Sequence, residues 1–310
     1  MVALKVQVDK VHTLTGHNQS VYTLQPSSKA NIVFSAAGDG MVAQWDLERP
    51  ESGQLVARLS NSIYALHYHP ASYLVIAGHN YEGIHLLNWE ERKETASLKL
   101  TTSAIFDIQS LGHYLYIATG DGVLCKVDCR TLTIEGRTQH SAKSARTIAI
   151  NKHTGEVAVG YSDNHIRVFS ADDLSLRRDW EAHQNSVFVL RYDQQGRRLY
   201  SGSRDARLKA WDVASGYTLH REVIAHLYAI NHLDLSPDGK HFVTCSMDRS
   251  VKVWETDELQ LLKVIDRARH AGHGTSVNRV LWTSFHDQLL SASDDRTISV
   301  WNINFENHLP

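Results

Sequence analysis

An aspartate and a tryptophan recur at one fixed spacing along the chain. In the stretch "YSGSRDARLKAWD", Asp205 stands six residues before Trp211, Ser201 stands four residues before that aspartate, and His183 stands 22 residues before it. The four sets of this pattern are His17, Ser35, Asp39 and Trp45; His183, Ser201, Asp205 and Trp211; His226, Thr244, Asp248 and Trp254; and His273, Ser291, Asp295 and Trp301. Such agreement does not arise by chance, so the chain is built from copies of one structural unit.

Weaker copies of the unit fill the gap between the first set and the second. The acidic positions of all seven units are Asp39, Glu82, Asp121, Asp163, Asp205, Asp248 and Asp295, which lie 39 to 47 residues apart. A period of this length, made of short strand-like runs and carrying the dipeptide Trp-Asp at 45–46 and 211–212, is typical of WD40 repeats.

The chain resembles the WD40-repeat family over essentially its whole length. The resemblance implies an all-β fold in a single domain, residues 1–310: a seven-bladed β-propeller of four-stranded antiparallel blades. Four units match the family strongly and three are degenerate. In the family, the His, Ser/Thr, Asp and Trp of one unit form a hydrogen-bonded network inside a blade, so we interpret the sixteen residues of the four sets as structural.

Two features of the residues agree with this interpretation. Apolar residues alternate after the turn acids, as at Ile166 and Val168, which is the period of a β-strand. The seventh unit ends after three strands, while the N-terminal run "KVQVDKVHTL" has no blade of its own. We therefore expect residues of about 4–14 to pair with the last blade and to close the ring, which removes an open sheet edge.

Composition narrows the class of protein. The net charge of -2 provides no basic field for nucleic acid or anionic lipid, so we do not expect either partner. The chain has three cysteines and no run of 18 apolar residues, and its N-terminus lacks the pattern of a signal peptide. We expect a monomeric cytoplasmic protein, with a nuclear location left open.

Motifs for catalysis are missing from the sequence. It contains no GxSxG, HExxH or CxxC pattern and no phosphate-binding glycine loop. His67, His69, His79 and His85 fall in one unit, and two imidazoles on one face of a strand can share a zinc ion. Because no third ligand follows at a characteristic spacing, we predict no metal site, no cofactor and no enzyme activity.

The resemblance also implies where a partner binds, which is the rim of the central channel. Carried over by register, the expected partner-binding residues are Tyr22, Tyr64, Tyr81, Phe106, Arg146, Phe188, Arg204, Asn231, Met247, Asn278 and Asp294. Aromatic side chains and arginine are enriched at binding hot spots, because they bury a large area at low entropic cost.

The favoured function is a non-catalytic scaffold or adaptor that binds a protein or peptide on this rim. The alternatives are a binder of a small molecule, a modified peptide or a phosphorylated ligand at the same face, or, less favoured, an enzyme. The aromatic residues favour a cationic side chain, through cation–π contacts. Arg146 and Arg204 favour an acidic or phosphorylated segment instead.

Overall fold

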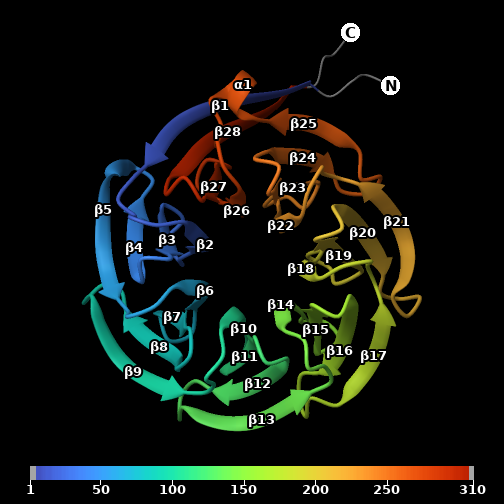
Figure 1. The fold of residues 1–310 in the computed structure, drawn as a ribbon. Coiled ribbons are helices and arrows are strands. Elements are labelled where there is room, and N and C mark those ends of the chain that lie inside the picture. Colours follow the sequence, from blue (N-terminus) through green and yellow to red (C-terminus); the bar gives the residue numbers. More distant parts are fainter. Residues whose placement is uncertain (1–4, 307–310) are drawn as a thin grey trace.

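In the computed structural model, which describes residues 5–306, seven four-stranded antiparallel sheets surround a central axis as the blades of a propeller. Figure 1 shows the closed ring viewed along that axis. Within the described residues, the single helix is the short α1 (Arg267–His270), which precedes the last blade. The predicted seven-bladed, nearly all-β propeller is confirmed.

The two inner strands of every blade lie nearest the axis. The innermost strands are β2 (Val21–Pro26), β6 (Ile63–His69), β10 (Ile105–Leu111), β14 (Ala145–Asn151), β18 (Val187–Tyr192), β22 (Ile230–Leu235) and β26 (Val277–Trp282). The second strands are β3 (Ile32–Ala37), β7 (Leu74–His79), β11 (Tyr114–Thr119), β15 (Glu156–Tyr161), β19 (Arg198–Ser203), β23 (His241–Ser246) and β27 (Leu289–Ser293).

The two outer strands complete each sheet. The third strands are β4 (Met41–Asp46), β8 (Gly83–Asn88), β12 (Val123–Asp128), β16 (His165–Ser170), β20 (Arg207–Asp212), β24 (Val251–Glu255) and β28 (Ile298–Glu306). The outermost strands are β5 (Arg49–Arg58), β9 (Lys93–Lys99), β13 (Thr133–Gln139), β17 (Leu176–Glu181), β21 (Thr218–Ile224), β25 (Leu261–Ile265) and, for the seventh blade, β1 (Lys5–Leu14).

The first strand of the chain closes the ring. β1 runs antiparallel to β28, from the pair Lys5 and Glu306 to the pair Leu14 and Ile298. In Figure 1 the blue β1 lies beside the red β28. Val6 and Val8 are buried in the core between the sixth and seventh blades. The expected closure by the N-terminal strand is therefore confirmed.

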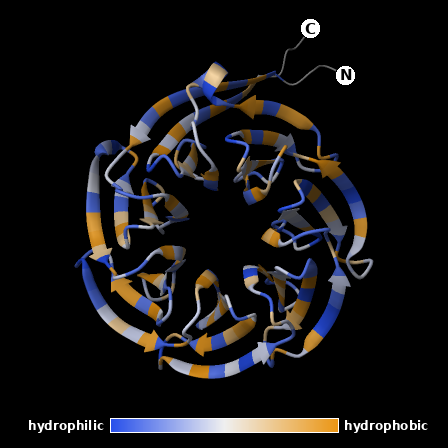
Figure 2. Ribbon diagram, viewed as in Figure 1, coloured by the Kyte–Doolittle hydropathy of each residue, from blue (hydrophilic) through white to orange (hydrophobic). Residues whose placement is uncertain are grey.

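The hydrophobic core lies between neighbouring blades. Each sheet is apolar on both faces, because each face packs on another blade: Val33 and Trp45 face the seventh blade, while Phe34 and Val42 face the second. The outermost strands have one face in solvent, and Figure 2 shows that β17 is largely polar. Because the third strands are covered on both sides, their residues alternate in direction without leaving a polar face in solvent.

The ring has two distinct faces. We call the rim face the one formed by the turns between second and third strands together with the loops that lead into the next innermost strand. The opposite face carries the turns between innermost and second strands. In the first blade the three-residue turn on the rim face is centred on Asp39, since Ala37 and Met41 flank it.

The second blade departs from this register. His79 pairs with Gly83, so Tyr81 is the central residue of the turn, and Glu82 follows it, one residue later than the spacing of the repeats predicted. Tyr81 has the left-handed φ of 73°, whereas in the first blade the left-handed residue is Gly40, which follows the acid. A bulky residue in that conformation is uncommon, so the turn of blade two has its own geometry.

The remaining sequence-level features are placed as follows. Within residues 5–306 no helix is long and apolar enough to cross a membrane. All three cysteines are free thiols; Cys125 and Cys245 are buried, and Cys129 is half-buried just after β12.

Because β1 closes the ring, its loss should destabilise the whole propeller. A chain that starts at Gln19 exposes the edge of β28 and the apolar surface covered by Val6 and Val8. We expect a lower melting temperature and self-association, measured by calorimetry and light scattering. Replacing the exposed Gln7 of the same strand by Ala is the control and should change neither. An undiminished melting temperature and a monodisperse truncated chain would contradict the closure.

Candidate functional site

A buried chain of hydrogen bonds joins the four repeated residue types in blades one, five, six and seven. In the fifth blade the Trp211 indole N–H donates to Ser201 Oγ at 2.8 Å, and Ser201 Oγ lies 2.8 Å from His183 Nε2. His183 Nδ1 lies 3.0 Å from Asp205 Oδ2. The other three blades repeat these contacts within a few tenths of an ångström.

The chemistry of its ends sets the direction of this chain. The indole can only donate and an ionised carboxylate can only accept, so the imidazole donates from Nδ1 to Asp205 and accepts the serine hydroxyl at Nε2. Burial lowers the pKa of His183, which keeps the imidazole neutral. Burial also works to raise the pKa of Asp205, but bonds from His183 and from two backbone N–H groups outweigh it and bring this pKa to about 2.

The network fastens two segments of the rim face to each other. Asp205 accepts the backbone N–H of Gln184, in the loop that enters the blade, and of Arg207, which begins β20. The backbone N–H of Arg204 donates to Ser186 O in the same region. These bonds hold the loop and the turn together, and the next residues of the loop lead directly to the channel.

A pocket of about 560 Å³ opens at the axis on the rim face. Residues from all seven blades line it, including eight of those that the register placed there: Tyr22, Tyr64, Tyr81, Phe106, Arg146, Phe188, Asn231 and Asn278. The other three, Arg204, Met247 and Asp294, do not line this pocket and sit in the surrounding turns. Met247 is 53% exposed, and Asp294 accepts a hydrogen bond from Asn278 Nδ2 at 2.8 Å.

Five of the lining side chains form one continuous series of ring contacts. Tyr22 packs edge-on against Tyr64 at 4.8 Å between ring centroids, and Tyr64 stacks with Phe106 at 5.8 Å. The Arg146 guanidinium then lies 3.9 Å from the centroid of Phe106 and 4.9 Å from that of Phe188. The aromatic socket is thus already occupied by a cation of the chain itself.

Two arginines of the pocket make no ion pair with the described residues, although the carboxylates of Asp107 and Asp234 act on the charge of one of them, Arg279. Arg146 and Arg279 both line it, and neither guanidinium makes an ion pair or a hydrogen bond to any residue that the structure describes. Arg279 Nε is buried without an acceptor. Burial lowers the pKa of both side chains, which nevertheless remain charged at neutral pH. A desolvated cation without a partner favours an incoming anion.

Other charged groups of the channel have hydrogen-bond partners. Arg191 Nη2 donates to Asp234 Oδ1 at 2.7 Å, and Asp107 accepts backbone N–H groups of Ile108 and Ile148 at 2.9 and 2.8 Å. Burial raises the pKa of Asp107, while the charge of Arg279 lowers it less strongly. Since these groups have partners, the unsatisfied charge is concentrated at the rim.

Sequence reasoning missed Asp107 and Arg279. Each follows an expected rim residue directly, so strict alternation along a strand would turn it away from the channel. The pairing of β10 with β11 and of β26 with β27 shifts by one residue at this point, and both adjacent side chains then face the pocket. The bulge recurs in all seven innermost strands, but no residue type in the sequence marks its position.

Sequence reasoning also missed an apolar patch on the rim face of blade six. Leu227 is 82% exposed and Tyr228 is 63% exposed, immediately after His226. Ser246 Oγ donates to the backbone carbonyl of Tyr228, which places this loop beside Met247. Leu227 and Tyr228 directly follow the blade histidine, so a comparison of the positions one and two after each histidine would have identified them from the sequence.

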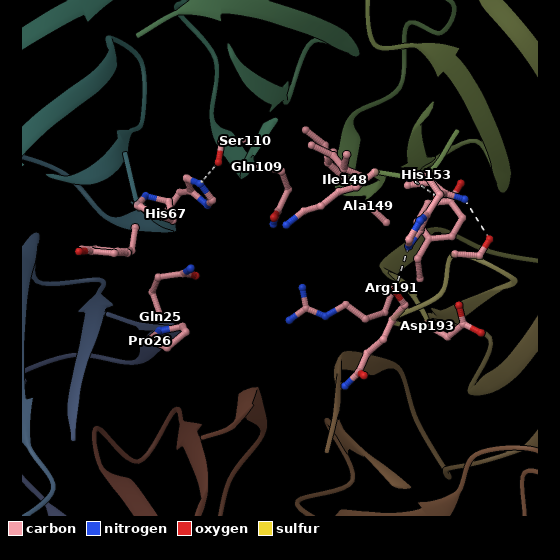
Figure 3. Close-up of a pocket in the computed structure, with 18 of the residues that line it drawn as sticks. Gln25, Pro26, His67, Gln109, Ser110, Ile148, Ala149, His153, Arg191 and Asp193 are labelled. Atoms are coloured by element: carbon pink, nitrogen blue, oxygen red, sulfur yellow. Dashed lines mark hydrogen bonds between the residues drawn. The ribbon is translucent and has the colours of Figure 1, made fainter. Parts of the chain in front are cut away.

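The opposite mouth of the channel holds another pocket, of about 590 Å³. Figure 3 shows Gln25, Gln109 and Arg191 extending from different blades toward its centre. Its arginine already has an anionic partner, since Arg191 is paired with Asp234. The rim pocket is therefore the better candidate for binding an outside group.

Comparison with known families agrees with the repeat pattern. The family model described as "WD domain, G-beta repeat" matches residues 8–46, 174–212, 217–255 and 265–302, which together make up half of the chain. These four segments are the four units with a complete network. The chain belongs to the WD40-repeat family.

Similar proteins have the same architecture at low identity. The crystal structure of the WD40 β-propeller domain of Doa1 superposes with a TM-score of 0.84 at 17% identity, covering 96% of this chain and 97% of that one. WD repeat-containing protein 1-B of Xenopus laevis is 22% identical over 94% of this chain and 48% of its own length, and actin-interacting protein 1 of Caenorhabditis elegans is also 22% identical, over 94% and 48%.

The chain spans about half the length of these curated relatives. Membership of the family supports a protein-interaction scaffold as the general role of the chain, because WD40 propellers generally act in this way.

The network predicts how stability depends on pH. The pKa of Asp205 is about 2 in the folded chain, below its usual value of 3.8. The ionised carboxylate therefore contributes fully to the free energy of unfolding above about pH 4, and this contribution is lost as the pH falls toward 2. Burial lowers the pKa of His17, His183 and His226, so protonation of the unfolded chain below pH 6.5 also reduces stability. We expect the free energy of unfolding to decline from pH 6.5 downward, measured by urea titration.

Replacing Asp205 by Asn should lower the free energy of unfolding by about 1–3 kcal/mol at pH 7, because a buried imidazole loses a charged acceptor. The control is Asp121→Asn, at the same turn position of blade three, where no histidine lies upstream. An equal loss of unfolding free energy in the two variants would show that the bond to the histidine does not add to the stability contributed by the turn aspartate.

Proposed function

We propose that the chain is a protein-interaction scaffold whose rim pocket captures an acidic segment of a partner. The observation that carries this proposal is Arg146, a buried cation that makes no ion pair with the described residues, together with Arg279, which also lines the pocket and has an unbonded Nε. A carboxylate or phosphate would supply the missing acceptor, and guanidinium groups bind such oxygens in bidentate geometry.

Arg146 also supports one of the two ligand charges that the rim sequence left open, the negative one. At Phe106 and Phe188 a lysine or methyl-lysine would compete with the Arg146 guanidinium, which already lies over both rings. A second cation would displace or repel this group. An anion would be attracted to this group, and the one carboxylate that lines the pocket among the described residues, Asp107, already accepts two backbone N–H groups. The flanking rings hold the guanidinium in place before binding, which lowers the entropic cost.

The patch on blade six supports a protein rather than a small ion as the ligand. Leu227, Tyr228 and Met247 are large, exposed and apolar, and they stand on the same face as the pocket. A peptide that places its acidic group at Arg146 could cover this patch with apolar side chains, as in the polar and apolar division of protein interfaces. The name of the actin-interacting relative is consistent with a protein partner.

Replacing Arg146 by Gln should abolish the preference for acidic peptides. The measurement is retention of the protein on an immobilised peptide library whose central residue is Asp, Glu, phosphoserine or Lys. We expect the acidic peptides to retain the unmodified chain, and we expect this retention to decrease as the salt concentration rises. The Arg146→Gln variant should bind the acidic peptides about tenfold or more weakly.

The control for that experiment is Arg197→Gln, which removes an arginine from a turn of the opposite face, where its side chain is 76% exposed. This variant should bind like the unmodified chain. Equal retention of lysine peptides, or equal weakening by both substitutions, would contradict an acidic ligand at Arg146.

Replacing Tyr22, Tyr64 and Phe188 together by Ala should remove partner capture from a cell extract while the fold persists, since these rings line the pocket and are not part of the inter-blade cores. Melting temperature would report the fold, and mass spectrometry would report the captured proteins. If the same proteins are captured by the triple variant, the rim is not the binding face.

A further inference from the structure

Blade two lacks the hydrogen-bond network and carries a cluster of metal-binding residue types in its place. At the strand positions that hold Ser35 and Trp45 in the first blade, the pairing of β7 with β8 puts Ala77 and Leu87. Neither residue can continue a chain of hydrogen bonds. The same part of the blade holds His79, at the end of β7, and His85, in β8.

These two histidines lie on one face of the sheet. Ala77 pairs with His85, and side chains two residues apart along β7 point to the same side, so His79 and His85 are diagonal neighbours. Their ring centroids are 5.3 Å apart. Ala77 packs against the first blade, so the pair faces the junction of blades one and two.

Glu82 completes the cluster from the turn. One ligand atom each of His79, Glu82 and His85 lies within 4.8 Å of the other two. Glu82 Oε2 is 3.5 Å from His79 Nδ1. The histidine pair was set aside on sequence grounds for want of a third ligand, and the altered turn of blade two supplies it.

One ring nitrogen of this cluster is not satisfied by the protein. His79 is 1% exposed, and its Nδ1 atom is buried without a hydrogen bond of acceptable geometry to the described residues, whereas His85 Nδ1 has a carboxylate oxygen of Glu94 beside it. His69 is bonded through both nitrogens, to Ser72 Oγ and to Gly112 O, whereas His67 is bonded through Nε2 to Ser110 Oγ and has an unbonded Nδ1. A buried polar atom without a partner needs an explanation, and only His79 has a second imidazole and a carboxylate beside its unbonded nitrogen among the described residues.

Neighbouring groups would orient the two imidazoles. His79 Nε2 lies 2.9 Å from Ser60 Oγ, and a proton held there leaves the Nδ1 lone pair free and directed toward Glu82. Glu94 Oε1, on β9, lies 3.1 Å from His85 Nδ1. Histidine ligands of metals commonly have such a second partner, which fixes the tautomer and the ring orientation.

We propose that His79, Glu82 and His85 form a binding site for a divalent transition-metal ion such as Zn²⁺. Two imidazole nitrogens and one carboxylate oxygen suit this class of ion and leave a coordination position open. The Glu82 side chain is 58% exposed, so the ion has a path from solvent. Binding would join β7, its turn and β8, which is the task of the hydrogen-bond network in blade one.

The experiment uses the chain without a histidine tag, first treated with a chelator. Titration with Co²⁺, followed by visible absorption, should give one equivalent with the bands of a site of low coordination number, and Zn²⁺ should displace them. His85→Gln and Glu82→Gln should each weaken Co²⁺ binding by about tenfold or more, since each removes one of three ligands. Zn²⁺ should raise the melting temperature of the unmodified chain and not of these variants.

A matched control is His165→Gln. His165 also contacts a carboxylate, with Nδ1 2.6 Å from Asp179 Oδ1, but no second histidine belongs to that contact. This variant should bind Co²⁺ like the unmodified chain. The absence of binding, or equal binding by the chain and by the Glu82→Gln variant, would overturn the site; Glu82 is exposed, so that variant remains folded. Neither result depends on whether the rim pocket binds an acidic peptide.

Discussion

The buried chain from tryptophan through hydroxyl and imidazole to aspartate is the interaction on which the four complete blades depend. It links the third strand, the second strand, the entry loop and the turn of one blade, and each of its polar atoms would otherwise be buried without a partner. Because the entry loop continues directly into the innermost strand, the network also holds the backbone of that blade's rim residue. Stability and the shape of the candidate site therefore share one cause.

Closure of the ring has a comparable effect on the whole molecule. A pocket that draws on all seven blades exists only when the last blade meets the first, and β1 provides this junction with residues from the other end of the chain. Each blade contributes the side chain of the same register position, and some blades add a second one, so a chemically varied rim is carried on a nearly uniform scaffold. Polar residues such as Asn278 on one side and the aromatic–arginine series on the other make the pocket asymmetric.

Blades two to four reach stability by other means. In blade four, Arg167 lies over the ring of Tyr161 at 4.7 Å and is paired with Asp163 and Asp179 at 2.9 and 3.1 Å. In blade two, a histidine–glutamate cluster stands at the junction with blade one. The network positions themselves hold apolar residues in these two blades, Ala77 and Leu87 in blade two and Val159 and Phe169 in blade four. The arginine at the centre of the rim, Arg146, also comes from this part of the ring.

Much of this molecule can be read from regular spacing. The number of blades, the four complete networks, the closing strand and eight lining residues all follow from a constant register, because identical units place identical positions at identical heights. Arg279 and Asp107 enter the pocket through bulges, the Glu82 ligand depends on a shifted turn, and the vacant hydrogen-bonding capacity of Arg146 depends on which groups surround it. Local periodicity is a property of the chain, whereas the pairing of charges and the approach of ligand atoms arise between blades and are settled only when the ring is closed.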